Sequence, residues 1–134
     1  VRTVCIFPTG HRLSSSSEIT PADLADEKLI HTRRESEFFK SLANAFLDAS
    51  VPLTSLVETR QFTAACELVS HGVGVAVVSE LDAINYGSSK IESRPFSPKI
   101  AHKLSLVHPT QKRPSAITSE FMNAFAESLK PFQV

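Results

Sequence analysis

The sequence predicts an α/β fold in which a mostly parallel sheet carries helices on both faces, and three observations support it. Predicted strands and helices alternate along most of the 134 residues, the pattern of strands joined by crossover helices. The run from Val75 to Val78 is apolar without alternation, as in a strand that is buried on both faces. An apolar helix ends directly before this strand at Gly72, a residue suited to the left-handed position after a helix.

The remaining elements are placed by periodicity and by residues that start or end helices. Phe38, Leu42 and Phe46 recur every four residues, which predicts a long amphipathic helix. We expect Gly74 to let two backbones approach closely. Thr20 and the proline after it predict the start of a short helix. The predicted strands cover 2–7, 28–32, 55–59, 73–78, 91–96 and 102–108, the other predicted helices cover 36–50, 61–71, 79–85 and 115–129, and a loop covers 109–114.

The composition favours one soluble globular domain. Hydrophobic residues make up 42% of the chain and charged residues 21%, which is typical of a chain with an ordinary core. Fourteen basic residues balance fourteen acidic residues, so no overall field draws the chain to nucleic acid or to an anionic membrane. No apolar run approaches the roughly 20 residues that a membrane span needs.

The chain ends and the cysteines give expectations about its context. The N-terminus lacks the basic start and long apolar core of a signal peptide. The first residue is valine and the only methionine is Met122, so we expect this chain to be a piece of a longer protein. Cys5 and Cys66 are too few for a disulfide framework, which predicts buried, reduced thiols and a cytoplasmic location.

The sequence carries no motif of enzyme chemistry, of metal binding or of cofactor binding. The five histidines lack the spacing of metal ligands, and no cysteine pair accompanies them. Gly72 and Gly74 precede a strand and lack the third glycine of a dinucleotide fingerprint. Neither a phosphate-binding Walker sequence nor a Gly-x-Ser-x-Gly elbow occurs. We therefore expect no enzyme activity, no cofactor and no metal.

Two segments are candidate ligand sites, because in such folds ligands bind beyond strand ends and near helix N-termini. In the first segment Thr32 and Ser36 offer hydroxyls, and Arg33 or Arg34 can clamp a carboxylate in a bidentate manner. The alternative is a hydroxyl cap beside two solvated arginines that pair with neighbouring glutamates. The arginines favour a small anionic metabolite, such as an amino acid or an aromatic acid.

The second candidate segment enters the helix that ends at Gly72. Thr59 can cap that helix or face a ligand, and Gln61 follows it. Thr9, just past the first predicted strand, is a further candidate for ligand binding.

Five segments resemble, in order and wording, the effector-binding domain of LysR-type transcriptional regulators. The family pattern is a strand, a Pro-x-x-His-x-Leu turn, an acid-led short helix, a glycine-punctuated helix–strand unit and a closing amphipathic helix. The matching segments extend over essentially the whole chain and read VCIFPTGHRL, ITPADLADEKLI, CELVSHGVGVAVVSE, IESRPFSP and HKLSLVHP.

The resemblance implies one lobe of a two-lobed, periplasmic-binding-protein-like domain. Residues 8–103 would form the second lobe, residues 1–7 a hinge strand, and residues 104–134 the return strand and helix of the first lobe. The DNA-binding domain and most of the first lobe would be absent from this chain. The last helix would then expose an apolar stripe unless a partner covers it, and that stripe consists of Ile117, Phe121, Phe125 and Leu129.

The implied function is ligand sensing for a transcriptional regulator. A small effector would bind between the lobes and change the angle of hinge strands near 2–8 and 103–108, which shifts the population of two states. The protein would self-associate as a dimer or tetramer and reach DNA only through the missing domain. Two other classes stay open: a solute-binding lobe of a transporter, and a small α/β enzyme that uses Cys66 or a histidine.

Overall fold

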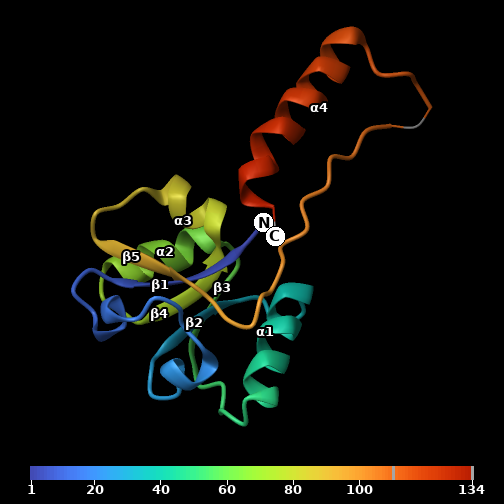
Figure 1. Ribbon diagram of the computed structural model, residues 1–134. Coiled ribbons are helices and arrows are strands. Elements are labelled where there is room, and N and C mark those ends of the chain that lie inside the picture. Colours follow the sequence, from blue (N-terminus) through green and yellow to red (C-terminus); the bar gives the residue numbers. More distant parts are fainter. Residues whose placement is uncertain (110, 134) are drawn as a thin grey trace.

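The computed structural model describes residues 1–109 and 111–133 and contains a five-stranded sheet in the order β3-β2-β4-β1-β5 (Figure 1). Strand β2 pairs in parallel with β3 and β4, whereas β1 pairs antiparallel with β4 and β5. Four of the five strands therefore run in one direction, which confirms the predicted α/β class with a mostly parallel sheet. The strands are β1 (Thr3–Pro8), β2 (Leu29–Thr32), β3 (Ser55–Thr59), β4 (Val75–Ser79) and β5 (Ile91–Pro95).

Helices cover both faces of this sheet. One face packs against α1, and the other packs against α2 and α3. The amphipathic helix predicted at Phe38 is α1, and Ser36 caps it. The helices are α1 (Glu37–Asp48), α2 (Phe62–Ser70), α3 (Glu80–Tyr86) and α4 (Ala116–Leu129), with short 3-10 helices at Arg12–Ser15, Pro21–Leu24 and Lys130–Phe132.

The two cores explain why β4 is apolar from Val75 to Val78. Val75 and Val77 face the core beside α1, whereas Ala76 and Val78 face the core beside α2. All five residues of β4 are buried. Because both faces of this central strand are covered by helices, both sets of alternate residues are apolar until Ser79 at the end of the strand.

Both cysteines are free and buried, as predicted. Burial raises the pKa of the Cys5 thiol, and it raises the pKa of the Cys66 thiol to about 11. Both groups therefore stay protonated near neutral pH, in a form that is a poor nucleophile.

Residues 101–109 form no strand, so the strand predicted over 102–108 is wrong. The Val1 nitrogen donates to the His102 oxygen at 3.0 Å, and the His102 nitrogen donates to the Val1 oxygen at 2.9 Å. Beyond this pair no strand of the described chain runs alongside, and a strand requires a partner for its backbone groups. The predicted loop over 109–114 includes Thr110, which lies outside the described residues.

The last helix projects from the sheet and carries an exposed apolar stripe (Figure 1). Ile117 is 75% exposed and Phe121 is 61% exposed. Leu104, Leu106 and Val107, in the segment that leads to the helix, are exposed as well. The expected exposure is confirmed for Ile117, Phe121 and Phe125, whereas Leu129 is half-buried.

Candidate functional site

Buried polar side chains gather at one edge of the sheet. The register places Thr32 beside Thr59 at the ends of β2 and β3, and it places Thr3 beside Ser79 where β1 meets the end of β4. The buried polar residues of the described chain are Thr3, His31, Thr32, Thr59 and Ser79, and all lie at this edge. We call it the polar edge; it is formed by the carboxyl ends of β2, β3 and β4, where ligands bind in open α/β sheets.

Thr32 and Thr59 lie side by side but differ in their hydrogen bonding. The Thr59 hydroxyl donates to the carbonyl oxygens of Gln61 at 3.2 Å and His31 at 3.4 Å. The Thr32 side chain is buried, and its hydroxyl bonds to no other described residue. The Thr32 oxygen is not among the buried unpartnered side-chain atoms, so it stays accessible to solvent. Because this hydroxyl is accessible and free of protein partners in the described residues, Thr32 is the better candidate for a ligand contact.

The prediction that Thr59 can cap the following helix is wrong. Thr59 belongs to β3, because its backbone pairs with Thr32 in the parallel ladder. The capping position of α2 is instead Gln61, and its side chain makes no capping bond. The first-turn amides of α2 thus lack a side-chain acceptor and are available to an anion.

Ser36 caps α1, as one reading of the sequence proposed. Its Oγ accepts a hydrogen bond from the Phe39 amide at 3.1 Å and donates one to the Arg33 carbonyl at 2.7 Å. This serine holds the loop between β2 and α1 in place, which fixes the position of Thr32 and the two arginines.

The two arginines of this loop are exposed and only loosely paired. Arg33 lies 3.6 Å from Glu35, and Arg34 lies 3.6 Å from Glu58. Exposed ion pairs of this kind contribute little free energy. Both guanidinium groups can therefore turn toward an anion at the polar edge with little loss.

Thr9 lies at the opposite edge of the sheet. It follows the carboxyl end of β1, which runs against β4. Its hydroxyl donates to the Ser89 carbonyl at 2.8 Å. The structure therefore does not bring Thr9 together with the other candidate residues.

An aromatic cluster that the sequence did not reveal joins His102 to Phe38 near the start of α1 and to Phe62 at the start of α2. The His102 ring stacks on Phe38 with ring centres 4.2 Å apart, and it meets the edge of Phe62 at 5.3 Å. The Nε2 atoms of His102 and of His31 are buried and have no partner among residues 1–109 and 111–133. Burial lowers the pKa of His102 to about 4, although the Asp82 carboxylate acts in the other direction.

The described residues offer no group of three or more histidine, cysteine, aspartate or glutamate side chains that could hold a metal ion. None of the helices in the same residues is long and apolar enough to cross a membrane.

Comparison with known proteins identifies the family. The family model for the LysR substrate binding domain matches residues 1–130, so the chain belongs to this family, as the resemblance implied. The transcriptional activator LysR of Escherichia coli K12 is 32% identical over 118 residues, which are 88% of this chain and 38% of that protein. The chain thus spans less than half the length of this relative.

Solved structures agree on the fold. The regulatory domain of CcmR from Synechocystis PCC6803, in complex with 2-PG, superposes with a TM-score of 0.70 and 20% identity over 96% of this chain and 63% of that chain. The effector-binding domain of QuiR, in complex with shikimate, gives a TM-score of 0.63 and 18% identity over 98% of this chain and 63% of that chain.

Proposed function

We propose that this chain is the ligand-sensing part of a LysR-type transcriptional regulator and that it binds a small effector at the polar edge. The observation that carries the proposal is the Thr32 hydroxyl beside Thr59, which bonds to no other described residue and is not among the buried unpartnered atoms, so it is open to a ligand. The structure of QuiR holds shikimate in an effector-binding domain of the same fold, which supports a small-molecule ligand.

The proposed effector is a small anionic metabolite. The first-turn amides of α2 lack a side-chain cap, and helix N-termini favour negative charge. Arg33 and Arg34 are held loosely enough to add bidentate contacts to a carboxylate. In this arrangement Thr32 and Thr59 orient the ligand, and the arginines and amides supply the attraction.

We propose that residues 8–103 form a second lobe and that residues 1–7 and 104–134 belong to the junction with a first lobe. Val1 and His102 form the pair at which the two connecting segments meet. An effector that prefers one angle between the lobes would shift the population of states, by no more than its differential affinity. The regulator would act in the cytoplasm, and its DNA-binding domain would receive this change.

Thr32→Val tests the effector site. Valine keeps the shape of threonine and removes only the hydroxyl, so we expect affinity for an anionic ligand to fall about tenfold, the usual value of a hydrogen bond to a charged group. Amide chemical shifts during titration with shikimate, benzoate and the common L-amino acids measure this. Thr54→Val, an exposed position at the other end of β3, is the matched control. Equal affinity of the Thr32 variant and the wild type for every bound probe would refute the proposed site.

Phe121→Asp tests whether the stripe on α4 is an interface. A charge at the centre of an apolar interface is costly to bury, so we expect the wild type to be a dimer or larger and the variant to be a monomer in light scattering. Ser119→Asp adds the same charge on the opposite side of α4 and should leave the mass unchanged. Identical masses for the wild type and Phe121→Asp would count against an interface there.

A further inference from the structure

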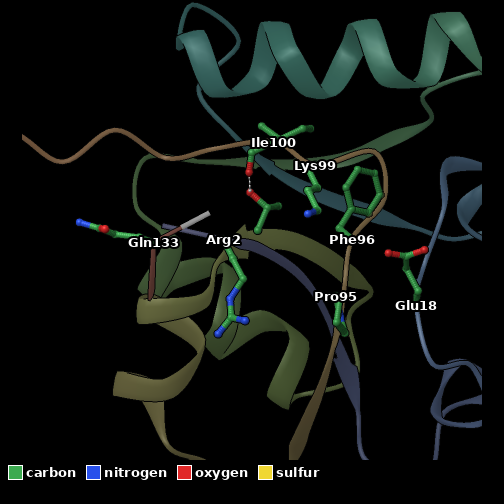
Figure 2. A pocket seen from close by; sticks show the side chains of 8 residues that line it. Arg2, Glu18, Pro95, Phe96, Lys99, Ile100 and Gln133 are labelled. Carbon is green, nitrogen blue, oxygen red and sulfur yellow. Dashed lines mark hydrogen bonds between the residues drawn. The ribbon is translucent and has the colours of Figure 1, made fainter. Parts of the chain in front are cut away.

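A cavity of about 230 Å³ lies beside the start of β1 (Figure 2). Its walls come from the start of β1, from the segment Pro95 to Ile100, and from Gln133 after α4. In the sheet, β4 separates β1 and β5 from β2 and β3. The cavity shares Thr3 with the polar edge, but Thr32 and Thr59 do not line it.

Buried apolar side chains form the floor of the cavity. Phe96 is 3% exposed and Ile100 is 8% exposed, and both line the cavity. The Thr3 hydroxyl donates to the Ile100 carbonyl at 2.5 Å, which ties the outgoing segment to β1. The floor can thus accept an apolar group without rearrangement of the backbone.

Two side chains of opposite charge reach the cavity without a partner. The Arg2 guanidinium is already engaged, because its Nε and Nη2 donate to the Glu80 carboxylate at 2.9 and 3.1 Å. Lys99 and Glu18 extend from different segments, as Figure 2 shows, and neither forms an ion pair within residues 1–109 and 111–133. The cavity therefore offers one cation and one anion beside an apolar surface.

We propose that this cavity binds a small zwitterionic amino acid with an apolar side chain. The ligand carboxylate contacts Lys99, its ammonium group contacts Glu18, and its side chain lies on Phe96 and Ile100. The volume of about 230 Å³ is below the roughly 300–1,000 Å³ of pockets for drug-sized ligands, which suits a molecule as small as an amino acid.

Because of the position of the cavity, this ligand would regulate the protein in addition to the effector at the polar edge. Gln133 follows α4, whereas Glu18 belongs to the body that carries the sheet. Since Gln133 also lines the cavity, a ligand held by Glu18 and Lys99 lies against both parts, binds best at one angle between them and so favours that state. By thermodynamic linkage, the amino acid changes the affinity of the polar edge for the effector, and the effector changes the affinity of the cavity for the amino acid by the same factor.

Three small molecules test the proposal on the 134-residue chain by amide chemical shifts. L-valine carries both charges, isovalerate only the carboxylate and isobutylamine only the ammonium group. We expect L-valine to bind in the millimolar range and to shift the amides of Thr3, Phe96 and Gln133. Equal affinity for isovalerate would overturn the zwitterion assignment, and no shift at these amides would overturn the site. Shifts confined to Thr32 and Thr59 would remove this cavity from the proposal and leave the proposed effector site intact.

Charge-removing variants give an independent test. Lys99 and Glu18 are exposed, so Lys99→Gln and Glu18→Gln should fold normally, which the melting temperature checks. Each should weaken L-valine binding about fivefold, the upper range of an exposed ion pair. Lys112→Gln and Glu120→Gln, exposed positions elsewhere, should change nothing. Unchanged binding in both cavity variants would overturn the assignment.

Discussion

The Gly74→Ala variant is expected to lose about 3 kcal/mol of unfolding free energy, the upper range for inserting an atom into a packed site. A Cβ at residue 74 would lie 2.2 Å from the Lys28 carbonyl oxygen and 3.2 Å from its carbon. That oxygen cannot move away, because it accepts the Val75 amide at 2.9 Å where β4 meets β2. Urea unfolding followed by circular dichroism measures the loss.

Gly10→Ala is the matched control for this substitution. Gly10 has a positive φ of 80° but no atom within 4 Å of an added Cβ. The Gly10→Ala variant should therefore lose only the free energy of placing alanine at a positive φ, about 1 kcal/mol. If the two variants were equally stable, close approach of the backbones at Gly74 would not be what requires glycine there.

The elements that the sequence predicted well are those determined by local chemistry. Strand β3 begins at Ser55 and ends at Thr59, as predicted. Helix α1 starts after Ser36, whose side chain caps it by accepting a hydrogen bond from the amide of Phe39, three residues later. Gly74 was expected to permit close backbone approach, and the neighbouring Lys28 carbonyl confirms it. In each case the residues that support the prediction lie within the element or next to it, although the carbonyl that Gly74 approaches belongs to the distant Lys28.

The elements that the sequence predicted wrongly depend on partners far along the chain. Apolar and polar residues alternate over 102–108 as in a strand. Within the described chain, however, only His102 of this segment forms backbone hydrogen bonds to a distant residue, Val1. Thr59 has the chemistry of a cap, yet pairing with Thr32 extends β3 through it and moves the helix start to Phe62. The local sequence pattern indicates which secondary structure a segment can form, but it does not indicate which other segment will pair with it.

The candidate site likewise depends on how segments that are distant in sequence pair with one another. Thr32 and Thr59 were predicted separately, each at the end of a strand, and they became neighbours because β2 and β3 pair in parallel. Thr9 was predicted by the same logic, but β1 runs in the opposite direction and places it at the other edge. His102 contacts Phe38 and Phe62 across long stretches of sequence, so no local signal could indicate its role.

Acidification is expected to destabilise the wild type more than a His102→Phe variant. Burial against Phe38 and Phe62 lowers the pKa of His102 from 6.5 to about 4. The unfolded chain binds this proton more readily, so the stability present above pH 6.5 is lost progressively as the pH falls toward 4. The full shift corresponds to about 3 kcal/mol, and solvent screening of the partly exposed ring reduces the expected loss to about 2 kcal/mol.

Phenylalanine retains an aromatic ring at residue 102 and cannot take up a proton, so the difference between the two proteins isolates this one group. Urea unfolding at pH 7 and near pH 4 measures it, and His108→Phe, at an exposed position, controls for loss of an ordinary histidine. Parallel losses in the wild type and His102→Phe would mean that the ring is solvated in solution. A larger loss in the wild type would mean that the neutral His102 ring is buried against Phe38 and Phe62, and that this contact holds the connecting segment to the starts of α1 and α2.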